Sequence, residues 1–437
     1  MKKIIIAIIA IATTCLNATA QNRPSPISEQ EKKKIIEQVN NLLIDEYIFP
    51  EVAKKTTNGL IANLKNGVYK SLTDPMEFAN NLTMDLRKLS NDNHFIIEFD
   101  PEWINESKKT VTKKDSLEFL NRDIAEFKKQ NFAFKEIKIL DGNIGYLKLI
   151  GFCPTSYAGE TAVAALSFLQ NTDAIIIDLR ENGGGSSDMV QLISSYFFSE
   201  QPQVFVEYFT RKGNLTERDY NLQYLPGKRM VDKNLYILTS HSTFSAAESF
   251  TYIMKNRNRA VIIGETTGGG ANPVSRKATN ENFTIRIPTS KVIDPITKTD
   301  WETVGIKPDF EVPLNEAIQI AQIKAIEKWA TSTPDNRQYL WQLDGLKGRL
   351  YPAQIAIETL KDYVGKYGPR KIFIEDGSLY FQREGSEKHK LIPIAQDLFL
   401  MDGVDNLKIK IQVENGKVIA INRLFDNGDS KVDKKSE

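Results

Sequence analysis

Three glycine-, serine- or threonine-rich segments contain the side chains that could carry out chemistry, and each follows a predicted strand. They are residues 178–185 (DLRENGGG), 240–245 (SHSTFS) and 264–270 (GETTGGG). Ser245 stands between the predicted strand 235–239 and a predicted helix. A hydroxyl there meets the positive end of the helix dipole and free amide N–H groups, which suit it to attack a carbonyl and stabilise the oxyanion. The same place also suits an N-cap serine, whose oxygen accepts from those amides.

The glycine run in 178–185 supplies backbone without side chains. An amide at Gly184 could therefore approach a substrate oxygen closely. A phosphate-binding loop does not fit, because no Gly-Lys-Ser/Thr follows the glycines. A flexible turn is the alternative, and the run alone does not decide between the two.

A serine nucleophile needs a base, and the chain has three histidines. His389 lies among charged residues, which predicts a solvated surface position. His241 lies four residues before Ser245 on the entering loop, where it could line a cleft. His94 closes the N-terminal helical region. By position alone, each of the three fits a structural role better than a catalytic one.

Alternating strands and helices from residue 144 onward must position these segments. Predicted strands cover 145–149, 174–178, 235–239 and 260–264, and predicted helices cover 160–170, 187–198 and 245–256. This order predicts an α/β sheet with helical crossovers. Ligands of such sheets bind beyond the carboxyl ends of the strands, which is where the three segments lie.

The regions before this sheet predict a helical N-terminal domain and a short connection. Ile35, Val39 and Leu43 recur at helical spacing within residues 21–100, and 74–77 (DPME) resembles a helix start. Residues 101–137 form a connecting segment with a predicted helix near 117–129. That segment is too short for an inserted β-rich, peptide-tethering module of about 90 residues.

The region after the sheet predicts a separate β-rich domain. The α/β domain spans 138–330, a polar linker spans 331–355, and residues 356–437 form a small antiparallel β domain. Its turn signals are 375–377 (EDG) and 415–416 (NG). Three domains agree with a length of 437 residues.

Charge and the N-terminal sequence bear on partners and location. Fifty-seven Lys plus Arg balance 56 Asp plus Glu, so we expect no nucleic-acid partner. The chain begins with two lysines and an apolar run, and an Ala-Thr-Ala sequence ends at Ala20. This pattern predicts a signal peptide at 1–20 that is cleaved after Ala20, and therefore export. The apolar run is too short to span a membrane. Acylation of Cys15 fits less well, because the usual Leu at −3 is absent. Cleavage would leave Cys153 as the only cysteine, without an internal disulfide.

Four segments, in order, resemble one family of serine peptidases, which comprises C-terminal-processing peptidases, the tricorn core and interphotoreceptor retinoid-binding protein. Residues 242–248 (STFSAAE), followed by 261–270 (VIIGETTGGG), resemble the nucleophile segment of this family. The family's glycine loop is similar to 178–185 and its closing motif to 300–309 (DWETVGIKPD). Residues 91–94 (NDNH) supply the fourth match. The resemblance covers about residues 27–315 and implies a crotonase-like core of the ClpP, βαβ-superhelix type.

One branch of this family uses a Ser-Lys dyad, with the lysine 25 positions after the serine. Here that position is Gly270, and neither Lys255 nor Lys277 matches the motif. The resemblance therefore points to the tricorn-like branch, in which a histidine from the end of the helical domain acts as the base.

Carried over residue by residue, this branch implies His94 as base, Glu302 as orienting acid and Asn93 as a neighbouring polar residue. Asp300 and Glu265 are alternatives to Glu302, and Asn93 could instead cap a turn. The amides of Gly184 and Ala246 are expected to face the oxyanion.

Together these features predict an exported serine peptidase, periplasmic or extracellular, that needs no metal or cofactor and cleaves short or unfolded peptides. The alternatives are a non-catalytic protein that binds a hydrophobic ligand, an esterase-type acyl hydrolase and a scaffold that acts through its C-terminal domain. Four aromatic residues could line an apolar specificity pocket or belong to the core: Phe152, Tyr157, Phe244 and Trp301.

Overall fold

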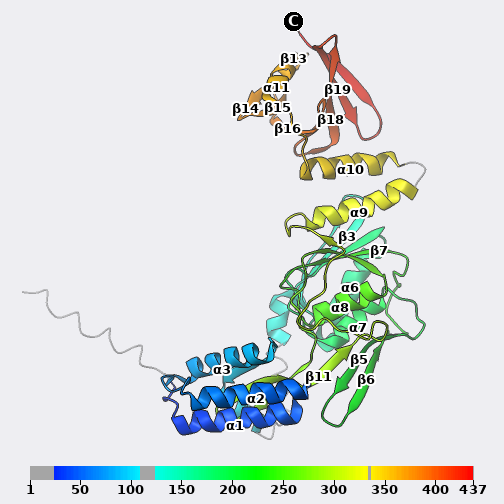
Figure 1. Cartoon of the computed structure of the whole chain (residues 1–437). Helices are drawn as coiled ribbons and strands as arrows, with labels where there is room; N and C mark the ends of the chain where they lie inside the picture. The colour runs from blue at the N-terminus through cyan, green and yellow to red at the C-terminus, as the bar shows by residue number, and fades with distance from the viewer. Residues whose placement is uncertain (1–23, 109–123, 333–335, 437) are drawn as a thin grey trace, which may run out of the picture. The chain divides into compact units, whose positions relative to one another are not determined.

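A computed structural model of the chain describes residues 24–108, 124–332 and 336–436 (Figure 1). The predicted signal peptide lies outside the described residues, and so does the first part of the predicted helix at 117–129. None of the helices in the described ranges is long and apolar enough to cross a membrane. Internal contacts divide the chain into two units: unit 1 is Met1–Arg122, Val206–Arg218 and Gly270–Ile293, and unit 2 is Asp123–Phe205, Asp219–Gly269 and Asp294–Glu437.

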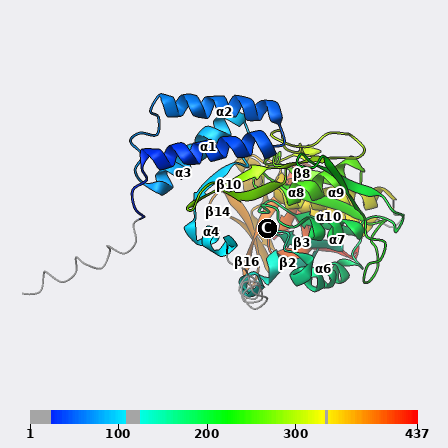
Figure 2. The same cartoon turned by 90° about the horizontal axis from the view of Figure 1, so that it is seen from below.

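Helices α1 (Glu29–Glu46), α2 (Pro50–Lys65) and α3 (Pro75–Ser90) confirm the predicted helical region and belong to unit 1. Figure 2 shows α1 and α2 side by side. Helix α3 begins where the sequence predicts, because the Asp74 carboxylate accepts from two backbone N–H groups of its first turn, at 2.8 and 2.9 Å. It ends at Ser90, and the C-cap residue that follows, Asn91, has a left-handed φ of 55°.

Two small antiparallel sheets involve the rest of unit 1. The first has the order β1 (Ile96–Phe99), β10 (Phe283–Pro288), β9 (Val274–Ala278) and shares a core with the helices through Phe78, Phe95 and Ile285. The second has the order β11 (Ser290–Ile293), β5 (Val204–Thr210), β6 (Leu215–Tyr220). Helix α4 (Pro101–Lys108) follows β1. Strands from beyond residue 200 thus join the N-terminal helices, which no sequence pattern signalled.

A six-stranded sheet in unit 2 confirms the predicted α/β scheme. Its order is β12 (Phe310–Glu311), β8 (Ala260–Gly264), β7 (Asn234–Thr239), β4 (Ala174–Asp178), β3 (Ile144–Leu149), β2 (Phe134–Leu140), and only β2 runs antiparallel to its neighbour. The crossover helices are α6 (Thr155–Leu169), α7 (Ser187–Ser195) and α8 (Ala246–Asn256). Helix α6 begins earlier than the predicted 160, because Asp188 accepts from the Thr155 N–H at 2.9 Å. A short 3-10 turn, Asn131–Ala133, precedes β2.

Two helices follow the sheet, α9 (Ala317–Ser332) and α10 (Arg337–Leu350), and they lie side by side in Figure 1. Most of the segment predicted as a linker, 331–355, is therefore helical. Leu343 and Leu346 of α10 are buried with Ala321 and Ile326 of α9 in the core cluster that includes the sheet. The spacing of these two leucines was a helix signal inside the predicted linker.

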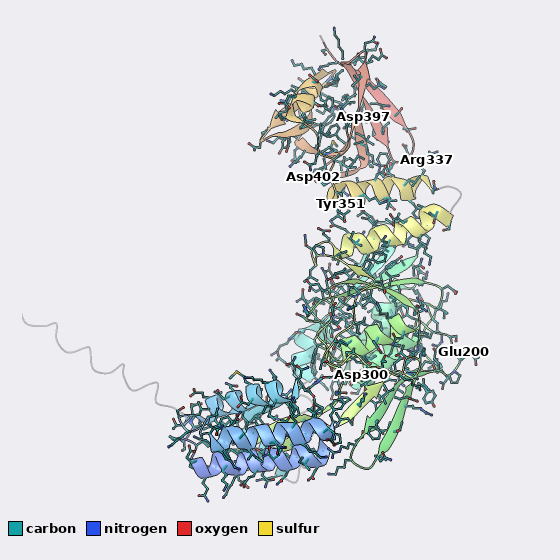
Figure 3. The ribbon with its side chains drawn as sticks, viewed as in Figure 1. Glu200, Asp300, Arg337, Tyr351, Asp397 and Asp402 are labelled. Atoms are coloured by element: carbon teal, nitrogen blue, oxygen red, sulfur yellow. The ribbon has the colours of Figure 1, made fainter. Side chains whose placement is uncertain are left out.

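The C-terminal region has the predicted β-rich structure. Helix α11 (Ile357–Tyr363) precedes an eight-stranded antiparallel sheet with its own core. Both predicted turns pair two left-handed residues, Asp376–Gly377 and Asn415–Gly416, as type I′ hairpins require. Figure 3 labels Asp397 and Asp402 in two further turns, and Tyr351 at the end of α10. The strands are β13 (Gly365–Tyr367), β14 (Arg370–Glu375), β15 (Ser378–Arg383), β16 (Lys388–Ala395), β17 (Leu398–Met401), β18 (Val404–Glu414), β19 (Lys417–Phe425) and β20 (Ser430–Lys434).

Candidate active site

Ser245 occupies a sharp turn between β7 and α8. Its backbone has φ 52° and ψ −118°, a region that L-residues with a side chain rarely adopt. An ordinary N-cap residue is instead in the extended region. Strained serines at strand-to-helix turns present the hydroxyl at the corner, where a nucleophile needs it. This conformation distinguishes Ser245 from an ordinary N-cap residue, although the bond from its backbone N–H to the Glu248 carboxylate is that of a capping box.

The glycine loop approaches this turn at backbone distance. A Cβ added to Gly184 would lie 2.9 Å from Ser245 Cβ, 2.9 Å from Phe244 O and 3.0 Å from Ala246 N, and Gly184 has a φ of +107°. The Phe244 N–H also donates to Asn182 O at 3.0 Å. Only glycine fits at 184, and within unit 2 the structure brings Gly184, Ser245 and Ala246 together.

The two predicted oxyanion donors differ in their surroundings. The Ala246 N–H is the first of helix α8, where no intrahelical acceptor exists. The Gly184 N–H donates to Asn182 Oδ1 at 2.9 Å, and the buried Asn182 side chain is itself anchored by donating to Leu149 O at 2.9 Å. The Ala246 amide is thus at a helix N-terminus, whereas the Gly184 amide already has an acceptor within its loop.

A buried ion pair anchors the start of the glycine loop. Asp178, at the end of β4, contacts the Arg180 guanidinium at 2.6 Å and accepts from the Tyr146 hydroxyl at 2.7 Å. Burial alone would raise the pKa of Asp178, but these bonds bring it below its usual range. Burial and the neighbouring carboxylate raise the pKa of Tyr146. Asp178 is therefore a structural carboxylate that holds residues 178–180 in place.

His94 lies in the turn between α3 and β1 of unit 1, with an ordered carboxylate beside it. Asp92 Oδ1 lies 3.0 Å from His94 Nδ1 and accepts from the His94 backbone N–H at 2.9 Å. Asp92 Oδ2 accepts from the Tyr47 hydroxyl at 2.9 Å. Both side chains are largely buried, with 8% of His94 and 4% of Asp92 exposed. In the tautomer in which Nδ1–H donates to Asp92, Nε2 carries the lone pair and is the basic nitrogen of the ring.

Asp92 is a functional candidate that the sequence analysis missed. Its only signal was the Asp-X-His spacing, which equally suits an Asx turn. Asn93, in the same turn, is exposed. Unit 1 thus places Asp92, Asn93 and His94 together, with the carboxylate directly on the imidazole.

Glu302 lies in a tight turn of unit 2. Its backbone N–H donates to Asp300 Oδ1 at 2.9 Å, so Asp300 acts as the turn's cap. The next residue, Thr303, has a φ of 64° and donates its N–H to Gly269 O at 2.8 Å. The alternative acid, Glu265, directly follows β8 and donates its N–H to Thr239 O at 3.0 Å.

The other two histidines occupy different surroundings. His241 is exposed on the loop before Ser245. His389 lies on β16 of the C-terminal sheet, where its Nδ1 is 3.1 Å from Asp402 O. Among the hydrogen bonds described for the three histidines, the bond to a carboxylate is made by His94.

A cavity of about 510 Å³ adjoins Gly184 and Gly185, and its lining is mainly apolar. Phe127, Ile150, Phe152 and Cys153 contribute to its walls. Phe127 stacks on Tyr157, with ring centroids 6.4 Å apart. Burial raises the pKa of the Cys153 thiol, so it stays protonated and adds to the apolar wall.

Of the four aromatic residues considered for a specificity pocket, Phe152 lines this cavity and Tyr157 supports it through Phe127. Trp301 is only 2% exposed and packs on Tyr252, with centroids 4.9 Å apart, so it belongs to the core. Phe244 lies against Gly268.

Comparisons with known proteins give one consistent family. The profile of Peptidase family S41 matches residues 143–312, and that of the N-terminal domain of Peptidase_S41 in eukaryotic IRBP matches residues 28–128. The tail-specific protease of Haemophilus influenzae is 30% identical over 154 residues, 34% of this chain and 21% of that protein. The carboxyl-terminal-processing protease of a Synechocystis species is 28% identical over 208 residues, 47% of this chain and 44% of that protein. The chain thus spans less than half of the length of either curated relative.

Among solved structures, the photosystem II D1 C-terminal processing protease aligns with a TM-score of 0.41 and 13% identity. The alignment covers 66% of this chain and 94% of that one.

Proposed function

Because this chain belongs to peptidase family S41, we propose that it is a serine peptidase with Ser245 as its nucleophile. The observation that carries the proposal is the strained conformation of Ser245 against the backbone of Gly184. Backbone strain of this kind costs about 1–3 kcal/mol and persists where function needs it.

The proposed reaction has two halves. In the first, Ser245 Oγ attacks the scissile carbonyl carbon and its proton passes to His94 Nε2. The C–N bond then breaks, and His94 returns the proton to the leaving amine. In the second, His94 takes a proton from water, the resulting hydroxide attacks the acyl-enzyme, and the proton returns to Ser245 Oγ as the acid leaves.

Asp92 is the group that we propose as orienter of His94. Its carboxylate holds Nδ1–H and stabilises the imidazolium that forms during attack. Glu302, which the family resemblance assigns to this role, is proposed as a second carboxylate that stabilises the same positive charge. Asn93 is proposed as a polar neighbour of the relay.

The oxyanion is proposed to bind the N–H groups of Ala246 and Gly184. The helix N-terminus supports the first assignment. The second requires the Gly184 N–H to share its hydrogen between Asn182 Oδ1 and the oxyanion.

We propose short or unfolded peptides as substrates, with an apolar side chain in the cavity beside Gly184. The names of the matched relatives, tail-specific and carboxyl-terminal-processing protease, support peptide bonds as the target. The basic, apolar N-terminal sequence supports export to the periplasm or the outside of the cell. Esters would be cleaved by the same chemistry.

The match to the IRBP N-terminal domain and the apolar cavity support a second candidate, a protein that binds a hydrophobic ligand without catalysis. The two candidates predict opposite results with a fluorophosphonate, which reacts only with an activated serine.

The test is fluorophosphonate labelling of the purified mature protein and of Ser245→Ala, His94→Ala and Ser242→Ala. Ser242 is an exposed serine of the same loop, so its variant is the matched control. We expect labelling of the wild type and Ser242→Ala, and none of the other two. A folded wild type that never labels would refute catalysis and favour ligand binding.

A further inference from the structure

Glu248, in the first turn of α8, is a carboxylate with no exposed surface. Its two oxygens bind different segments of unit 2. Oε2 accepts from the Ser245 backbone N–H at 2.9 Å. Oε1 accepts from the Thr267 hydroxyl at 2.5 Å and from the Gly269 N–H at 2.7 Å.

A buried carboxylate is costly unless hydrogen bonds satisfy it, and bonds to a charged acceptor are stronger than neutral ones. Its bond to the Ser245 N–H is that of a capping box, which an exposed glutamate at the same position could also make. Capping explains neither its complete burial nor the bonds of Oε1 to Thr267 and Gly269. The three donors are instead the groups that Glu248 holds in place.

The first of these bonds acts on the nucleophile. The Ser245 N–H belongs to the peptide that must rotate for the serine to reach a φ of 52°. A charged acceptor on this N–H stabilises a backbone conformation that a serine otherwise disfavours.

The other two bonds act on a second loop, which in turn holds the turn of Glu302. The Thr267 hydroxyl accepts from the Ile306 N–H at 2.7 Å, and Gly269 O accepts from the Thr303 N–H at 2.8 Å. A Cβ on Gly269 would lie 3.0 Å from the Thr303 carbonyl carbon, so the two backbones are in direct contact.

We propose that Glu248 is a positioning residue of the peptidase, one that holds the Ser245 turn and the Glu302 turn in a single arrangement. Oε2 fixes the backbone conformation of Ser245 through its N–H. Oε1 fixes the position of residues 267–269, whose polar groups hydrogen-bond to the backbone of residues 303–306. Glu248 itself contacts neither substrate nor reacting atoms. This inference rests on the proposed function of Ser245.

Glu248→Gln is the direct test, because the amide keeps the size of the side chain but offers only one oxygen. Its NH₂ group must face either the Ser245 N–H or the Thr267 and Gly269 donors. We expect the fluorophosphonate labelling rate per folded molecule to fall at least about tenfold, since small misplacements of reacting groups have large effects. On a peptide substrate, kcat should fall by a similar factor with KM little changed.

Thr267→Val and Thr267→Ser form a matched pair that tests the same network without touching the helix. Valine lacks the hydroxyl that donates to Glu248 and accepts from Ile306, whereas serine keeps it. We expect kcat to fall in the valine variant and to stay near the wild-type value in the serine variant.

The outcomes separate this inference from the function on which it rests. A wild type that does not label, or a Ser245→Ala that does, overturns both. Labelling by the wild type, with Glu248→Gln and Thr267→Val labelling at its rate per folded molecule, overturns the positioning role alone. If Glu248→Gln does not fold, equal kcat in the Thr267 pair overturns it, and a valine-specific loss of kcat supports it.

Discussion

Replacing Asp92 by asparagine should slow catalysis strongly while preserving the shape of the His94 turn. In the wild type, Oδ1 binds both the His94 backbone N–H and the ring, and Oδ2 accepts from Tyr47. The asparagine oxygen can keep the two His94 bonds, and its NH₂ group can donate to the Tyr47 hydroxyl. What is lost is the negative charge against a nearly buried imidazole.

The size of the effect follows from these contacts. A hydrogen bond to a charged group contributes about 1.5–3 kcal/mol and a neutral one about 0.5–1.5 kcal/mol, so the lost charge costs about 1–2 kcal/mol. That is roughly 5- to 30-fold in rate. If the amide flips and donates to Nδ1, the wrong tautomer extends the loss to about 10⁴-fold, the value for the corresponding change in the serine-protease template. We therefore expect kcat to fall between roughly 5-fold and 10⁴-fold.

The assay is hydrolysis of a peptide substrate together with fluorophosphonate labelling, both normalised to the folded fraction. Asp85→Asn is the matched control, because Asp85 also binds a tyrosine hydroxyl of unit 1, that of Tyr69 at 2.6 Å, without a histidine. Its labelling per folded molecule should equal that of the wild type. An Asp92→Asn variant that hydrolyses within about twofold of the wild type would refute Asp92 as orienter.

Three further substitutions test other parts of the structure. Gly184→Ala should lower the labelling rate at least about tenfold, because the added Cβ would lie 2.9–3.0 Å from backbone atoms of residues 244 and 246. Gly183→Ala is the control and should label at the wild-type rate, because no heavy atom beyond its chain neighbours lies within 4 Å of its Cβ. Equal labelling rates for the two variants would contradict the close approach at Gly184. Phe127→Ala removes an apolar wall of the cavity beside Gly184, so it should raise KM up to about tenfold for peptides with large apolar side chains and leave kcat nearly unchanged. An unchanged KM across a panel of peptides would exclude this cavity as a substrate site. Asp178 has a lower pKa in the folded protein than its value of about 3.9 in the unfolded chain. Its ionised form therefore adds to the free energy of unfolding above about pH 3.9, and this contribution is lost as the pH falls through the folded pKa. Asp178→Asn should therefore be less stable than the wild type at pH 7, with the difference shrinking below about pH 4 in urea denaturation; a constant difference down to pH 2 would refute this linkage.

Much of the fold and the outline of the site can be read from the sequence. Apolar spacing predicts the N-terminal helices and the alternating sheet, and Asp-Gly and Asn-Gly pairs predict two hairpins of the C-terminal sheet, because these signals act within a few residues. The position of Ser245 after a strand, together with four ordered segments that resemble one family, singles out Ser245 as the proposed nucleophile. The carboxyl ends of neighbouring parallel strands then predict that the Gly184 loop lies beside it.

Other features depend on contacts between distant segments, which no local pattern encodes. Strands β9 and β10, for example, share a core with helices that precede them by some two hundred residues. Glu248 looks like an ordinary first-turn glutamate until the fold buries it against Thr267 and Gly269. In the sequence, Asp92 resembles an ordinary turn residue. In the fold, its Oδ2 accepts from the hydroxyl of Tyr47, 45 positions earlier, and its Oδ1 contacts the His94 ring. The physical reason is that a carboxylate's role depends on which donors surround it when water is excluded, and those donors are gathered by the path of the whole chain.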